Sequence, residues 1–171
     1  RRSSDFGGNG TAEMPYLLYT KDDLEALTTG MDAGFATIGK YFKIMNDIEG
    51  VTTPISGDFR GDFNGNGHTV SVNLEGPGYL AMFATLGDDA NVHDLTVDGS
   101  IHSTGGNAAG LVSYISDDYT VTISNCVNLA IVTGNSDNVA GIVGNFSGIG
   151  LIENCVNKAS ISTNGNYCGG I

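Results

Sequence analysis

Basic residues, tryptophan and proline are scarce in this chain. Its 171 residues include seven Lys and Arg against 19 Asp and Glu, a formal net charge of −12, no Trp and three Pro. Seven basic side chains cannot form the positive stripe with which a nucleic-acid surface displaces counterions, nor can they attract anionic lipid by charge. The composition therefore excludes nucleic acid as a partner and is compatible with cations or neutral sugars.

Long hydrophobic runs and cysteines are also limited. No stretch approaches 18 consecutive apolar residues, so the sequence predicts no transmembrane helix. Three cysteines are an odd number and too few for a disulfide scaffold. The chain opens at Arg1 without an apolar signal core, so we expect a processed or trimmed chain whose export signal is already gone.

Helix signals occur at one place only. Thr20 is a candidate N-cap with Asp23 as its capping-box partner, two leucines follow on one face, and Gly30 is a stop signal. These signals predict a helix at Lys21–Thr29. Elsewhere, 26 glycines and frequent Asn and Asp indicate many short strands joined by turns.

An internal repeat is the strongest pattern in the sequence. VHDLTVDGSI from Val92 aligns without gaps with ISNCVNLAIV from Ile123 and IENCVNKASI from Ile152, at offsets of 31 and 29 residues. Nine residues after each block comes a glycine: Gly110, Gly141 and Gly170. Two independent features that keep the same offsets indicate repeated structural units.

A unit of 29–31 residues with strands and turns fits one coil of a β-solenoid. Weaker echoes upstream, YFKIM from Tyr41, TVSVN from Thr69 and Met82-Phe83, extend the array to about five turns. We therefore predict an all-β chain that folds as a right-handed parallel β-helix with one short N-terminal capping helix.

Three regions follow from this division. Residues 1–10 are expected to be a flexible leader, 11–47 an N-terminal cap with the helix and first strand, and 48–171 the solenoid repeats. The last repeat stops inside its Gly-Gly-Ile block, so we expect a truncated array. Unpaired strand edges on such a coil predict end-to-end self-association.

The aligned columns predict the role of each repeated side chain. Asp94, Asn125 and Asn154 tolerate left-handed backbone and are expected to form a corner. The next column, Leu95, Cys126 and Cys155, is expected to point inward, because a cysteine that replaces leucine acts as a small hydrophobic residue. Asn128 and Asn157 are expected to hydrogen-bond along the axis as a ladder.

Chemical roles for the two cysteines are less favoured than this structural one. A zinc site needs clustered Cys and His at short spacing, and a cysteine nucleophile needs a nearby base. Stacked, in-register cysteines have poor disulfide geometry, so we expect both to be reduced. His68, His93 and His102 form no HxxxH pattern and are expected at turns or on the surface.

Candidate binding residues lie in the acidic loop SYISDDYT. Tyr114, Asp117, Asp118 and Tyr119 could contact a sugar or a protein partner, or the tyrosines could pack over the coil end. Asp88 and Asp89 are weak candidates for a calcium site, with solvated turn carboxylates as the default. No cofactor and no catalytic residue is predicted.

The segment GDFRGDFNGNGHTVSVNL, residues 57–74, resembles the F-x-G-x-F-[DN]-G-N-G-H-T-[IV] signature of GLUG-motif surface proteins. AGLVSY from Ala109 and AGIVGN from Ala140 resemble the motif that names this family. The resemblance implies an exported, adhesin-like β-helical protein at the cell surface, often lipid-anchored to the outer membrane. The integrin tripeptide Arg60-Gly61-Asp62 falls on the signature's fixed glycine and its two flanking variable positions, which favours a family position over an integrin role.

These observations favour a non-catalytic surface adhesion module that binds a glycan or a host or matrix protein. One alternative is a carbohydrate-active β-helix enzyme, although Arg60 is the only arginine beyond the leader to complete such a site. The other alternative is a passive surface spacer. Carboxylates of perturbed pKa that converge in a groove would favour the enzyme.

Overall fold

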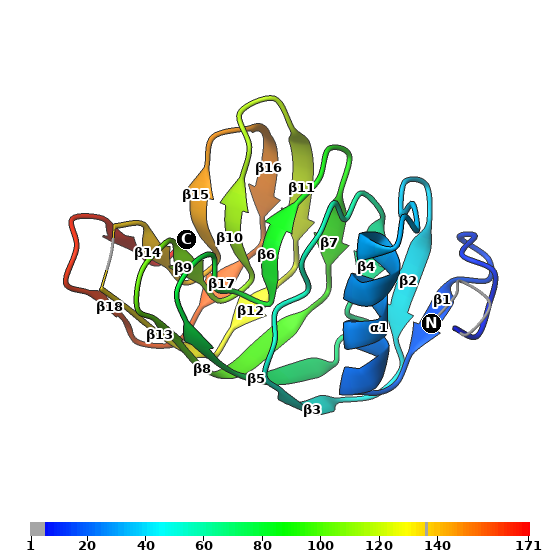
Figure 1. Cartoon of the computed structure of the whole chain (residues 1–171), viewed down its shortest axis with the longest axis horizontal. Helices are drawn as coiled ribbons and strands as arrows, with labels where there is room; N and C mark the ends of the chain where they lie inside the picture. The colour runs from blue at the N-terminus through cyan, green and yellow to red at the C-terminus, as the bar shows by residue number, and fades with distance from the viewer. Residues whose placement is uncertain (1–5, 136) are drawn as a thin grey trace.

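Short parallel strands stack coil upon coil along the chain (Figure 1). The computed structural model describes residues 6–135 and 137–171. Every pairing between its strands is parallel, and the strands form about five turns of a β-solenoid with one short helix. The predicted all-β solenoid is confirmed.

The strands form four walls, which each complete coil visits in the order A, B, D, C. Wall A contains β1 (Tyr16–Leu18), β2 (Tyr41–Ile44), β4 (Asp62–Asn64), β7 (Asn91–His93), β11 (Thr120–Ser124) and β16 (Ile149–Glu153). Wall B contains β3 (Ile48–Val51), β5 (Thr69–Gly76), β8 (Thr96–Ser103), β12 (Val127–Asn128), β13 (Ile131–Gly134), β17 (Val156–Asn157) and β18 (Ile161–Thr163). Wall C contains β6 (Phe83–Leu86), β10 (Val112–Ile115) and β15 (Val143–Phe146). Wall D contains β9 (Ala108–Ala109), β14 (Val139–Ala140) and β19 (Cys168–Gly169).

The strand register reproduces the alignment read from the sequence. Ile123 pairs with Val92 on one side and Ile152 on the other. In wall C, Val112 pairs with Phe83 and Val143. The offsets of 29 and 31 residues are therefore the lengths of successive coils, which confirms the repeat.

Aromatic side chains fill the core of the N-terminal coils. Phe42, Phe59, Phe63 and Phe83 are fully buried, and the ring centroids of Phe63 and Phe83 lie 5.0 Å apart in an edge-to-face arrangement. Val92 and Ile123 take the corresponding wall A positions further along, in register with Phe63. Stacking like upon like buries side chains that a single coil would leave exposed.

Helix α1 (Lys21–Asp32) begins where the sequence predicts and ends later. Thr20 and Asp23 form the expected capping box. The predicted stop at Gly30 is wrong, because Gly30 is buried inside the helix and Gly34, with φ of +94°, ends it. The amide of Phe35 donates to the carbonyl of Gly30 and that of Gly34 to Met31, which satisfies the last carbonyls of the helix.

Part of the expected leader packs on the fold, and the expected cap contains the first strands of wall A. Within residues 1–10, Phe6 is buried against Tyr16 and Phe42, and the amide of Leu17 donates to Gly7, so residues 6–10 pack on the fold. Residues 1–5 lie outside the described residues. In the cap, β1 already pairs with β2, so wall A begins inside the segment 11–47.

No helix within residues 6–135 and 137–171 has the length and apolar character needed to cross a membrane, α1 having 12 residues.

Candidate functional site

The repeated Asx column lies at the corner between walls A and B. Asp94, Asn125 and Asn154 have φ of 54°, 53° and 52°, in the left-handed region. Each residue follows a wall A strand and precedes a wall B strand. This turn reverses the in-and-out order of side chains, so the residue after the corner faces the core.

Leu95 and Cys126 occupy that core position and are fully buried, and Cys155 is half-buried against the same core. The structure has all three cysteines, including the exposed Cys168, as free thiols. The hydrogen bond between the two stacked thiols, together with burial, raises the pKa of Cys126, and the same bond lowers the pKa of Cys155 to about 7. Cys126 is therefore an inert core thiol, whereas Cys155 has more thiolate character.

Asn128 and Asn157 lie one above the other in wall B. The Asn128 amide donates to Asn157 Oδ1 at 2.9 Å and to the carbonyl of Ala130 at 2.9 Å, and its Oδ1 accepts from the amide of Ala130. Asn157 makes the same contacts with Ala159. In the preceding coil Val97 lies within the unbroken strand β8, so these asparagines bridge the break that separates β12 from β13 and β17 from β18.

The repeated glycines make room for this ladder. A Cβ at Gly110 would overlap the side chain of Asn128 and the carbonyl of Gly141. A Cβ at Gly141 would overlap Asn157 and the carbonyl of Gly170 in the same way. Gly170, in the last coil, has nothing within 4 Å of its Cβ position. The repeated glycines and the repeated asparagines therefore recur together in the sequence because they pack against each other.

Tyr114 and Tyr119 line a single surface cavity of about 290 Å³, which we call the tyrosine cavity. Tyr114 projects from β10, and Tyr119 ends the turn that leads into β11. Tyr79 stacks on Tyr114, with ring centroids 5.3 Å apart and planes 9° from parallel. The remaining lining residues are Gly57, Asp58, Thr85, Leu86 and Ser116.

The four candidate binding residues are therefore only partly brought together. Asp117 and Asp118 are exposed in the same turn but do not line the tyrosine cavity. Tyr119 also packs against the core, as the packing alternative predicts, and its binding role stays a prediction. Sequence reasoning missed Tyr79 and Asp58, because neither stands at a repeat offset from Tyr114.

Asp88 and Asp89 lie at the equivalent turn one coil earlier. Asp88 Oδ1 accepts the amide of Thr120 at 2.7 Å, and Asp89 has φ of 66°. Among residues 6–135 and 137–171, no group of three or more His, Cys, Asp or Glu side chains is placed to hold a metal ion. The geometry gives Asp88 a role in joining successive coils and adds nothing to the calcium interpretation.

His93 has a strongly raised pKa, and it lies in a strand and not at a turn, with its side chain partly exposed on the outer face of wall A. It lies in β7, where its Nε2 is 2.9 Å from Asp62 Oδ1 and its Nδ1 is 2.6 Å from Asp94 Oδ2. The hydrogen bond to Asp62 is the main cause that raises the pKa of His93 to about 9, against the effect of burial. The imidazolium thus links the coil of β4 to the coil of β7.

We call the contacts of His93 with Asp62 and Asp94 the histidine clamp. This clamp predicts that the stability of the fold depends on pH. Because the folded pKa exceeds the unfolded value of about 6.5, the contribution is fully present below pH 6.5 and is lost as the pH rises through 9. We expect the free energy of unfolding to fall by about 1–2 kcal/mol over this range relative to His93→Gln. Urea unfolding at several pH values measures the difference. His102→Gln is the control, because His102 contacts the hydroxyl of Thr133 and no carboxylate; equal slopes for His93→Gln and wild type would exclude the clamp.

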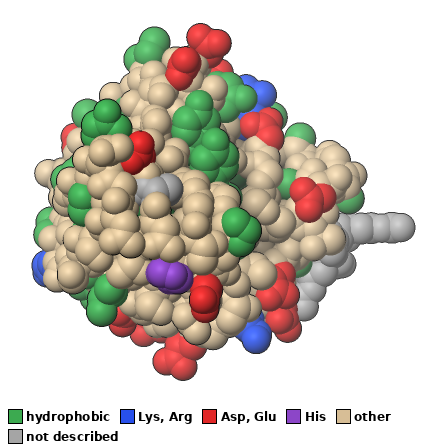
Figure 2. Space-filling view, turned by 60° about the vertical axis from the view of Figure 1, so that its left-hand side comes forward, with side chains coloured by type: hydrophobic (Ala, Val, Ile, Leu, Met, Phe, Trp, Pro, Cys, Tyr) green, Lys and Arg blue, Asp and Glu red, His purple; other side chains and the backbone are tan. Residues whose placement is uncertain are grey.

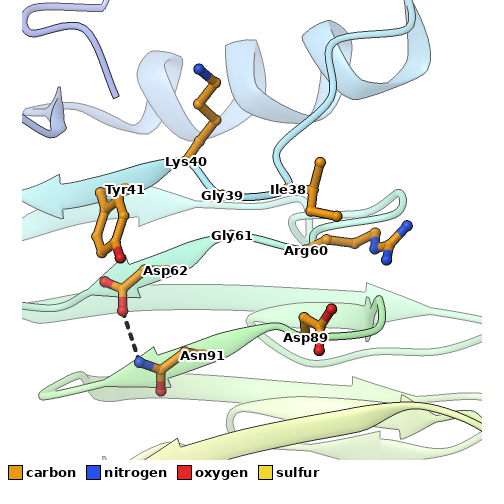
Figure 3. A pocket seen from close by; sticks show the side chains of 9 residues that line it. All are labelled: Ile38, Gly39, Lys40, Tyr41, Arg60, Gly61, Asp62, Asp89 and Asn91. Atoms are coloured by element: carbon orange, nitrogen blue, oxygen red, sulfur yellow. Dashed lines mark hydrogen bonds between the residues drawn. The ribbon is translucent and has the colours of Figure 1, made fainter. Parts of the chain in front are cut away.

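A second cavity of about 390 Å³, which we call the polar cavity, lies beside the integrin-like tripeptide (Figure 3). Arg60 and Asp89 lie on one side of it, and Tyr41, Asp62 and Asn91 on the other. The Asp62 carboxylate accepts from Asn91 at 2.7 Å and contacts His93. The tripeptide therefore runs into strand β4 with its aspartate engaged, which does not favour integrin binding.

The surface seen from the C-terminal end is mostly backbone and uncharged polar side chains, with several hydrophobic side chains, scattered acidic ones and few basic ones (Figure 2). Large apolar side chains are exposed in the last described coil: Ile149, Leu151, Val156, Tyr167 and Ile171. Self-association through this end stays an expectation.

Comparison with known proteins gives two partial relatives. The chain is 30% identical over 165 residues to Halomucin of Haloquadratum walsbyi, an alignment that covers 85% of this chain and 2% of that protein. It is 26% identical over 130 residues to a candidate Gly-rich membrane protein of Evansella cellulosilytica, covering 67% of this chain and 14% of that protein. The chain thus spans a small part of either relative.

No family model matches the chain, so the GLUG resemblance rests on its motifs. A solved structure of a candidate immunoglobulin A1 protease from Bacteroides ovatus aligns with 95% of this chain and 86% of that chain. Its sequence identity is 13% and its TM-score 0.35, too low to carry an argument about this chain.

Proposed function

We propose that the chain is a cell-surface binding module that holds a glycan in the tyrosine cavity. The observation that carries this proposal is that Tyr114 and Tyr119 line one cavity together with Asp58, while Tyr79 stacks on Tyr114 and holds its ring in place. Aromatic faces stack on the apolar faces of sugars, and carboxylates and hydroxyls accept and donate to sugar hydroxyls. Surface location is supported by the names of the partial relatives, a mucin and a membrane protein; lipid anchoring stays an expectation.

The enzyme alternative has less support from the geometry. Carboxylates of perturbed pKa that converge in a groove would favour an enzyme. The group with a strongly raised pKa beside the polar cavity is instead His93. Both ring nitrogens of His93 are engaged by carboxylates, which leaves neither for a proton transfer to a substrate. A hydrolytic activity on the bound glycan would restore this alternative.

A glycan array with host matrix proteins in parallel tests the proposal. We expect Tyr114→Leu and Tyr119→Leu each to weaken the selected glycan's Kd by about 10-fold, because leucine keeps apolar volume but removes the stacking face. Since the chain has no Trp, tyrosine fluorescence reports binding directly.

Tyr167→Leu is the matched control, because Tyr167 is exposed in the last coil and lines a different cavity. A Kd unchanged by both cavity variants would place the glycan elsewhere. If the chain bound no glycan and no matrix protein, the passive spacer would be favoured.

A further inference from the structure

Three cavities lie along the corner where the chain passes into wall A. The segments that form this corner are residues 35–40 before β2, 57–61 before β4, 87–90 before β7 and 116–119 before β11. In Figure 1 these connections run along the upper edge of the solenoid, one after another. The polar cavity reaches from the first of these segments to the third, and the tyrosine cavity from the second to the fourth.

A third cavity of about 240 Å³ adjoins both, and we call it the middle cavity. Asp58 lines both the tyrosine cavity and this middle cavity, and Arg60 lines both the middle cavity and the polar cavity. A Cβ at Gly87 would overlap Asp58 Oδ1 and contact Arg60 Cγ, so the two side chains lie next to each other over the Gly87 backbone. The three cavities therefore adjoin one another at Asp58 and Arg60, and we refer to them together as the groove, which crosses successive coils.

The floor of this groove is fixed by hydrogen bonds. The amide of Arg60 donates to Thr37 Oγ1 at 2.8 Å, and that hydroxyl donates to the carbonyl of Asp58 at 3.3 Å. Arg60 Nε donates to the carbonyl of Asp88 at 3.1 Å, which ties the side chain to the next coil. A groove whose polar groups are held in place loses little conformational entropy when a ligand binds.

We infer that this groove binds a linear neutral oligosaccharide laid along the solenoid axis, with the tyrosine cavity and the polar cavity as its two end subsites. The inference rests on the proposed function and adds the length of the bound oligosaccharide and a second subsite. Successive coils are about 4.8 Å apart, so the four corner segments span about 14 Å, enough for about three sugar rings in a row. Lys40 and Arg60 line the groove together with Asp58, Asp62 and Asp89, so it has no excess of positive charge with which to hold a uronate or sialate chain, and its carboxylates suit sugar hydroxyls.

Fragments of one to six residues, cut from the neutral glycan with the strongest array signal, test the groove by calorimetry. We expect affinity to rise from the monosaccharide to about the trisaccharide and then level off. Arg60→Gln should weaken trisaccharide binding by about 10-fold and leave monosaccharide binding unchanged, whereas Tyr119→Leu should weaken both. Lys158→Gln, a change of the same charge in the last coil, should leave both Kd values unchanged.

Arg60→Gln could also loosen the corner, so its melting temperature is measured alongside. Asp89→Asn is the second variant, because asparagine accepts the left-handed φ of this position, and we expect it to weaken only fragments of about three residues or more. Length-independent affinity with no effect of either variant would overturn the groove while Tyr119→Leu still upheld the proposed function. A strongest signal from an acidic glycan would overturn the neutral-chain inference, and no glycan signal at all would remove both proposals.

Discussion

Replacing Gly110 with alanine is expected to lower the free energy of unfolding by about 3 kcal/mol. The added Cβ would overlap the buried Asn128 side chain on one side and the carbonyl of Gly141 in the next coil on the other. The asparagine could move only by giving up hydrogen bonds in the core, and the backbone could move only by separating stacked strands. Either response costs several times the effect of an ordinary surface substitution.

Gly105→Ala provides the matched control, because its Cβ position has no atom within 4 Å and its φ lies outside the left-handed region. It should change the free energy of unfolding by less than about 0.5 kcal/mol. Urea unfolding followed by circular dichroism measures both variants. If Gly110→Ala were as stable as Gly105→Ala, the glycine column would not be required by packing against the ladder.

Replacing Asn128 with valine is expected to cost about 3 kcal/mol, although valine occupies the equivalent position in the preceding coil. Val97 lies in an unbroken strand, whereas Asn128 bonds both backbone groups of the buried residue Ala130 and also Asn157. Valine fits the equivalent position one coil earlier but would leave the amide and carbonyl of Ala130 without a partner in the core.

Asn157→Val is the graded comparison. Asn157 makes the same two bonds to Ala159 but is only half-buried, so water can replace them and the expected cost is about 1 kcal/mol. Equal losses at the two positions would show that burial does not set the cost, and no loss at Asn128 would show that the ladder is dispensable.

The sequence predicted the wall positions well because a solenoid repeats its local environment. A coil of 29 or 31 residues presents the same corner and the same core position at each level, so Asp94, Asn125 and Asn154 share one backbone conformation. A role predicted for a residue in one coil therefore applies to the residue one coil length later. The helix start at Thr20 was predictable for a similar reason, because a capping box is a local interaction.

The features that the sequence predicted poorly depend on contacts between segments that are distant in the sequence or on a choice between two competing local signals. Gly30 lies inside α1 because the chain finds a better end at Gly34, and Phe6 packs on the first strands instead of belonging to a free leader. His93 was expected at a turn or on the surface, and it lies in a strand, where register places it against Asp62 of the preceding coil.

By itself the sequence determined the β-solenoid, its coil length and the side chains that line its interior, because apolar and Asx residues recur at fixed offsets. Only the tertiary structure decided the groove. Asp58 and Arg60 lie in the corner segment 57–61 and Tyr119 in the segment 116–119, and these side chains come together because stacking brings the corners of successive coils together. The local sequence determines the conformation of each coil. Which side chains meet on the outer surface depends on how successive coils are aligned when they stack.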